Sequence, residues 1–148
     1  MMELFSIVES FRDEIVETLS NLIEIKALSP EWGGEGEYDK AEYLMTKLGG
    51  LEVERYDAED SRAKFGIRPN IVARLHGKTD KTIWFVSHLD VVPEGDESLW
   101  ETNPFKAVVK NGRIYGRGSE DNGQAIVSTL YAAKSIIKAD IKPNYSIG

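Results

Sequence analysis

Cysteine is absent from the 148-residue chain, and histidine occurs only twice, as His76 and His88. The lack of cysteine excludes disulfide bonds, cysteine-ligated zinc sites and a thiol nucleophile. The 18 lysines and arginines are outnumbered by 25 aspartates and glutamates, which gives a net charge of −7. The basic surface that binding to phosphate backbones requires is therefore missing, and we expect no nucleic-acid partner.

Long hydrophobic runs are also lacking, since no apolar stretch approaches the roughly 18 residues of a membrane-spanning helix. The N-terminal segment MMELFSIVESFRDEI mixes acidic with apolar residues and has no basic start. It therefore does not have the pattern of a signal peptide. Together with the absence of cysteine, these features predict a cytoplasmic protein without a membrane partner.

Three stretches have the periodicity of amphipathic helices. In the first, apolar residues recur at spacings of three and four, at Leu4, Val8, Phe11, Ile15, Leu19 and Leu22. This pattern predicts a helix over residues 4–28 that ends before Pro30. A second helix is predicted over 39–48, with Asp39 and Glu42 as a capping box, and a third over 122–138.

Short apolar runs bounded by turn residues predict strands. Residues 51–56 form one strand, and residues 70–75 and 82–86 are predicted to pair as a β-hairpin across HGKTD. Because residues 83–86 do not alternate with polar ones, we expect that strand to be buried on both faces. Residues 108–109 and 113–115 make another turn-linked pair, and NYSIG opens one more strand. The order of elements predicts an α/β fold, with helices flanking a central sheet of mixed strand direction.

His88 and Asp90 directly follow the predicted strand 82–86, where the chain enters a loop rich in proline, glycine and acids. The carboxyl ends of strands are where open α/β sheets usually place their sites. Neutral imidazole is a good zinc ligand, and a carboxylate two residues later can hold the ring in the required tautomer. Taken alone, the pair favours the alternative of a loop histidine bonded to a local carboxylate.

Asp121 lies in a second candidate stretch, GRIYGRGSEDNGQ, where a glycine-rich turn enters the third predicted helix. An aspartate at such a place can cap the helix or bind metal ions, and the turn alone leaves both roles open. Gly116 and Gly118 begin a G-x-G-x-x-G pattern, but Asp121 takes its sixth position. A negative charge there is incompatible with a phosphate cradle, so we exclude nucleotide binding.

The segments SHLDVVP, LWETNPF, NGRIYGRGSEDNGQ and KPNYSIG, in this order, resemble the M20 metallopeptidase family. The resemblance implies a zinc-exopeptidase-like fold, with His88 as a metal ligand and Asp121 as the carboxylate that bridges two zinc ions. It implies that Asp90 is the catalytic residue that orients His88, and that the Asp121–Asn122 peptide is cis. Cobalt or manganese would suit the same ligands. The family's Asp-Met-Lys-Gly or Asp-Asp-Lys-Gly is Asp121-Asn122-Gly123-Gln124 here, which leaves the substrate class open.

The resemblance also implies that further parts are needed for catalysis, because the family's Glu-Glu pair and final histidine would lie beyond Gly148. We therefore expect residues 1–148 to be the N-terminal part of a truncated catalytic domain, without the lid and dimerisation domain of a parent that can be a homodimer. That parent would use a two-metal-activated water to hydrolyse the amide bond of an N-acyl amino acid or short peptide. The fragment itself would be inactive. The alternative is a non-catalytic binding or assembly module that retains the half-fold.

Overall fold

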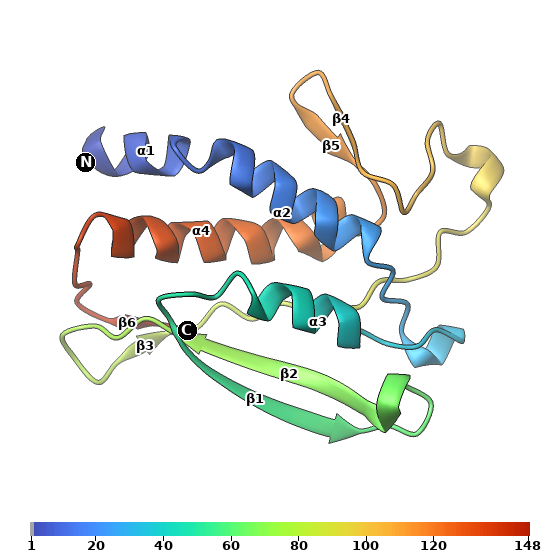
Figure 1. Cartoon of the computed structure of the whole chain (residues 1–148), viewed down its shortest axis with the longest axis horizontal. Helices are drawn as coiled ribbons and strands as arrows, with labels where there is room; N and C mark the ends of the chain where they lie inside the picture. The colour runs from blue at the N-terminus through green and yellow to red at the C-terminus, as the bar shows by residue number, and fades with distance from the viewer. Residues whose placement is uncertain (1) are drawn as a thin grey trace.

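Helices and short strands form two adjoining layers in the computed structural model, which describes residues 2–148 (Figure 1). The helices are α1 (Met2–Glu9), α2 (Arg12–Glu24), α3 (Tyr38–Met45) and α4 (Ala125–Lys138). The strands are β1 (Glu52–Glu59), β2 (Ile67–Arg74), β3 (Thr82–Ile83), β4 (Val108–Lys110), β5 (Arg113–Tyr115) and β6 (Ser146–Ile147). In Figure 1, α1 and α2 run along α4, and α3 lies between α4 and the β1–β2 pair. Over residues 2–148, no helix has both the length and the apolarity that a membrane crossing requires.

The hydrophobic core lies between the helices. On α4, spacings of three and four residues put Val127, Leu130 and Tyr131 on one face, which packs against Leu22 and Ile23 of α2. Ile23 is 2% exposed and Tyr131 only 1%. The hydroxyl group of Tyr131 lies 2.8 Å from that of Thr18, so the one polar atom of this large buried side chain has a partner.

The first predicted helix is wrong in its continuity and in its end. It is divided at Ser10–Phe11, where the Ser10 hydroxyl donates to the carbonyl oxygen of Ile7 at 2.6 Å and competes with regular helical bonding. It ends at Glu24 rather than residue 28, because the chain then runs extended beside Val91. The Val91 amide donates to the Ala27 carbonyl at 2.8 Å, which belongs to this pairing.

The other two helices were predicted correctly in kind, but both differ at their starts, and α3 ends at Met45 rather than residue 48. The capping box is wrong: α3 begins at Tyr38, so Asp39 lies in the first turn, where its carboxylate binds the Lys64 ammonium group at 2.6 Å. The third helix begins at Ala125 instead of residue 122. Residues Ser119–Gln124 form an irregular π-helical turn ahead of it.

The strands pair in both directions, as predicted, and they form three two-stranded sheets. β1 and β2 are antiparallel, β3 and β6 are parallel, and β4 and β5 form the predicted hairpin. The hairpin predicted between residues 70–75 and 82–86 is wrong. Leu75 instead forms an antiparallel bridge to Ile147, so β6 inserts between the end of β2 and β3.

The prediction that residues 83–86 are buried on both faces is also wrong. Only Thr82 and Ile83 form a regular strand, and Val86 is 91% exposed. The run Trp84–Val86 lines a groove of about 630 Å³, whose other walls come from β2, α3 and α4. We call this groove the sheet groove. Its apolar lining is typical of a surface that is covered by another element or molecule.

Candidate metal centre

The segment that carries His88 and Asp90 is anchored at both ends. At its start, the Phe85 amide donates to the Gly148 carbonyl at 2.8 Å, which continues the β3–β6 pairing. At its end, Val91 is 6% exposed and is bonded to Ala27. The backbone from residue 85 to residue 91 is therefore fixed while the His88 side chain reaches the surface.

Asp121 is presented by the turn that precedes α4. The Gly123 amide donates to the Gly118 carbonyl at 2.9 Å, and a Cβ atom on Gly123 would lie only 2.5 Å from that carbonyl oxygen. Glycine is thus required for the turn to close. The capping role is wrong, because α4 begins at Ala125 and its cap position belongs to Gln124, three residues after Asp121. The predicted cis peptide at Asp121–Asn122 is confirmed.

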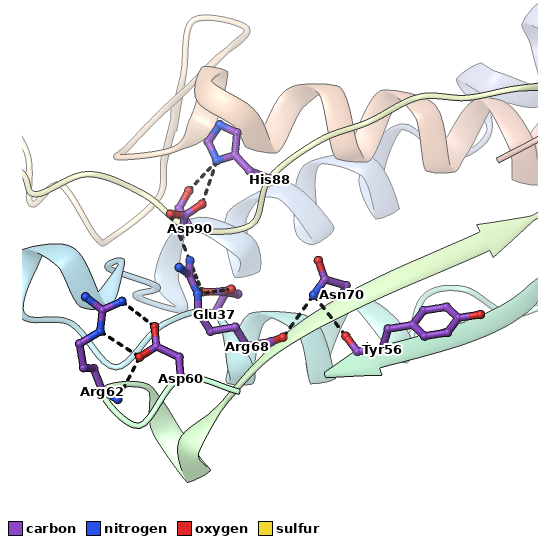
Figure 2. Close-up of polar contacts among 8 residues, drawn as sticks. All are labelled: Glu37, Tyr56, Asp60, Arg62, Arg68, Asn70, His88 and Asp90. Carbon is purple, nitrogen blue, oxygen red and sulfur yellow. Dashed lines mark hydrogen bonds and ion pairs between the residues drawn. The ribbon is translucent and has the colours of Figure 1, made fainter. Parts of the chain in front are cut away.

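His88 lies between the two predicted carboxylates. Its Nε2 atom is 2.9 Å from Oδ1 of Asp121, a residue 33 positions away in the chain. Its Nδ1 atom is 2.9 Å from the Asp90 carbonyl oxygen and 3.3 Å from Oδ1 of the Asp90 carboxylate. Figure 2 shows the contacts between His88 and Asp90. The structure thus brings together all three residues that the sequence selected.

The electrostatics of the site favour a cation near His88. Partial burial of the ring opposes its protonation, but hydrogen bonds to Asp121 and Asp90 and the charges of both carboxylates outweigh burial. The pKa of His88 therefore lies above its ordinary value. Asp121 is largely exposed, with 84% of its side chain accessible, so an ion can approach it from solvent.

The donor atoms fit a divalent metal, but the set is small. An imidazole nitrogen and a carboxylate oxygen, facing each other across 2.9 Å, are ligands of the kinds that zinc takes. Residues 2–148 contain no cluster of three or more such side chains placed to hold a metal ion. Catalytic zinc usually has three protein ligands, so His88 and Asp121 form an incomplete shell.

A charged cluster that the sequence did not predict lies on the side of Asp90 away from His88. It consists of Glu37 and Lys40 from the start of α3 and Arg68 from β2. Burial lowers the pKa of Lys40 to about 8, although the negative charges of Asp90 and Glu37 oppose this shift. No sequence pattern connects these three residues, because the cluster forms only when β2 packs beside α3.

Comparisons with known proteins relate this α/β fold, with its histidine between two carboxylates, to metallohydrolases. Residues 84–148 match the model of peptidase family M20/M25/M40. An uncharacterized metallohydrolase of Methanocaldococcus jannaschii is 47% identical over 144 residues, which cover 91% of this chain and 35% of that protein. A succinyl-diaminopimelate desuccinylase of Buchnera aphidicola is 34% identical over 119 residues, covering 79% of this chain and 28% of the desuccinylase.

The fold has a close counterpart among solved structures. A dipeptidase of Saccharomyces cerevisiae superposes with a TM-score of 0.82 at 21% identity, over 99% of this chain and 33% of the dipeptidase. This likeness concerns the fold alone. From the sequence matches, the chain belongs to the M20 peptidase family. It spans only about a third of the length of these relatives.

Proposed function

We propose that this chain is part of a zinc-dependent amide hydrolase, to which it contributes two metal ligands and the residue that orients one of them. The supporting observation is the placement of His88, with Nε2 2.9 Å from Asp121 and Nδ1 against Asp90. The segments that carry His88 and Asp121 are far apart in sequence, and an imidazole nitrogen of one lies beside a carboxylate oxygen of the other. Membership of a family of metallohydrolases makes a divalent metal the natural occupant.

Each residue would have a distinct role. His88 would bind one ion through Nε2, and Asp121, with two accessible carboxylate oxygens, would bridge two ions. Asp90 would accept the Nδ1–H hydrogen bond, which fixes the ring orientation and increases its basicity. When bound, such a pair of metal ions polarises the scissile carbonyl group and lowers the pKa of a water molecule.

The proposed substrate is an N-acyl amino acid or a short peptide. The name of a sequence relative supports this class, since it is a succinyl-diaminopimelate desuccinylase. We propose zinc as the metal, with cobalt or manganese as substitutes that the same ligands would accept. A cytoplasmic location and a homodimeric parent protein complete the proposal.

Because only two protein ligands, His88 and Asp121, are available, we propose that the 148-residue chain binds zinc weakly and hydrolyses no substrate. The test is calorimetric titration of zinc into the purified chain and into H88A and D121A. Each substitution removes one of two ligands, so we expect at least about a tenfold loss of affinity. His76 provides the matched control, because it is the only other histidine and pairs with Glu52 instead. H76A should retain the original affinity.

Two outcomes would contradict weak zinc binding and the lack of activity, and a third would contradict the metal site itself. Nanomolar zinc binding that is lost in D121A would show a complete metal shell, and hydrolysis of an N-succinyl amino acid or a dipeptide by this chain would show complete catalytic machinery. If zinc binding were the same in H88A, D121A and the original chain, the metal role would fail altogether. The exposed sheet groove would then favour the alternative of a binding or assembly module.

A further inference from the structure

The charged cluster behind Asp90 contains two side chains that are rarely buried. Lys40 is 5% exposed and Glu37 is 8% exposed. Charged groups at this depth are usually paired, because their transfer from water is costly. Figure 2 shows that Glu37, Arg68, Asp90 and His88 form one continuous series of contacts from the start of α3 to the candidate metal centre.

Arg68 is the central member of this series. Its Nε atom donates to Oε1 of Glu37 at 2.9 Å and its Nη2 atom donates to Oε2 at 3.1 Å. The same Nη2 atom lies 3.6 Å from Oδ2 of Asp90. The other oxygen of that carboxylate, Oδ1, faces Nδ1 of His88. The two oxygens of Asp90 therefore have different partners, which limits rotation of the carboxylate.

This orientation matters because a neutral imidazole carries one proton on only one of its nitrogens. Asp90 offers Nδ1 two acceptors, its backbone carbonyl oxygen at 2.9 Å and its carboxylate oxygen at 3.3 Å, and Asp121 offers one to Nε2. If Nε2 carries the proton, it has no lone pair for a metal. A firmly placed Asp90 favours the proton on Nδ1 and leaves Nε2 free.

We propose that Arg68, held by Glu37, is a positioning residue that keeps the Asp90 carboxylate on Nδ1 of His88 and so selects the tautomer that can bind a metal. The metal-binding part of this inference rests on the proposed function, whereas the tautomer part does not. The planar guanidinium group suits the role, since its fork contacts Glu37 at two points and still reaches Asp90. Lys40 adds a second positive charge near the same two carboxylates.

A second arginine supplies a matched control. Arg62 forms a similar fork with Asp60, through Nε at 2.9 Å and Nη2 at 2.8 Å (Figure 2). This pair lies in the loop between β1 and β2 and is separate from the Asp90–His88 contact in the same view. R62Q therefore removes a guanidinium–carboxylate fork of the same kind and removes none of the contacts of Arg68 with Glu37 and Asp90.

The experiment is nitrogen-15 NMR of histidine-labelled, metal-free chain at a pH where the ring is neutral, with circular dichroism to check folding. In the original chain, His88 should have its proton on Nδ1 and a pyridine-type Nε2. We expect R68Q and E37Q to shift the proton towards Nε2, R62Q to leave it unchanged, and R68K to give an intermediate result because it keeps the charge but loses the fork. Zinc affinity of R68Q should fall about tenfold, the typical effect of losing an outer partner of a ligand.

The inference is overturned if R68Q and R68K keep the original tautomer, if R62Q shifts it as much as R68Q does, or if the original chain already carries the proton on Nε2. If R68Q does not fold, the comparison of R68K with R62Q decides. Failure of the original chain to bind zinc would count against the proposed function alone, because the tautomer is measured without metal.

Discussion

The helical core and the sheet groove differ sharply in how completely their apolar residues are covered. In the core, Ile23 and Tyr131 are almost fully buried between α2 and α4. In the groove, Trp84, Phe85 and Val86 are each at least half exposed, although they are just as apolar. Apolar composition alone therefore does not determine burial, which depends on whether a neighbouring element lies opposite.

The candidate metal centre lies at the border between these two regions. Val91, at the end of the ligand-bearing segment, is buried beside Ala27, whereas His88 and Asp90 line the groove. The helical side thus supplies rigidity and the open side supplies access. Four stability predictions test this contrast: the largest expected effect and its matched control come first, the intermediate effect next and the smallest last.

The largest effect is expected in the helical core. Tyr131→Ala removes a side chain that is 1% exposed, together with its contact to the Phe11 ring at 5.5 Å. We expect the free energy of unfolding to fall by about 3–5 kcal/mol, as for other buried aromatic truncations. Urea denaturation followed by circular dichroism measures this change.

The matched change in the groove is Val86→Ala, which should alter the free energy of unfolding by less than about 0.5 kcal/mol because Val86 is 91% exposed. A loss of similar size in both variants would contradict the contrast between the two regions. It would show that the groove is covered in solution, for example by a second copy of the chain.

An intermediate effect is expected at Lys40, where burial lowers the pKa from 10.5 to about 8. The unfolded chain then binds a proton more strongly than the folded chain between these two values, so stability rises as pH increases from about 8 to 10.5. At pH 7 the folded state keeps a buried charge at a cost of up to about 3 kcal/mol. Lys40→Met should therefore be more stable than the original chain at pH 7, by about 1–3 kcal/mol.

The difference between the two proteins should vanish as pH rises towards 10.5, since both are then neutral at residue 40. Urea unfolding at a series of pH values measures it, and groups common to both proteins cancel. A difference that stays constant with pH, or a less stable methionine variant at pH 7, would show that attraction to Glu37 and Asp90 outweighs burial.

The smallest stability effect is expected for Phe85→Ser. The Phe85 side chain is 55% exposed, and the hydrogen bond from its backbone amide to the Gly148 carbonyl is unaffected. The free energy of unfolding should change by less than about 0.5 kcal/mol. Binding of an apolar fluorescent dye to the groove should nevertheless decrease clearly, since an exposed aromatic ring is lost. Unchanged dye binding would mean that the groove does not offer this surface in solution.

The sequence predicted best what depends on local pattern. Spacings of three and four residues located α3 and α4, and two motifs located His88 and Asp121, whose meeting the structure confirms. The interruption at Ser10 was missed because no proline or glycine marks it, and a serine side chain makes the competing hydrogen bond.

Features that depend on distant partners were not predictable in this way. The false hairpin between residues 70–75 and 82–86 rested on proximity in sequence, whereas the real neighbour of both segments is β6. Residues 83–86 were predicted as buried because composition cannot reveal that one side faces a groove. Arg68 and Glu37 escaped notice because nothing in either local sequence indicates their shared contact with Asp90.

The insertion of β6 between β2 and β3 has a consequence for the order of events during synthesis. A ribosome releases β2 and β3 well before it reaches Ser146, so for that interval both strands have open edges next to an apolar run. Unpaired edges of this kind are sites of intermolecular pairing, and pairings between distant residues form slowly. The nascent chain should therefore need protection by chaperones until β6 emerges and joins the two strands.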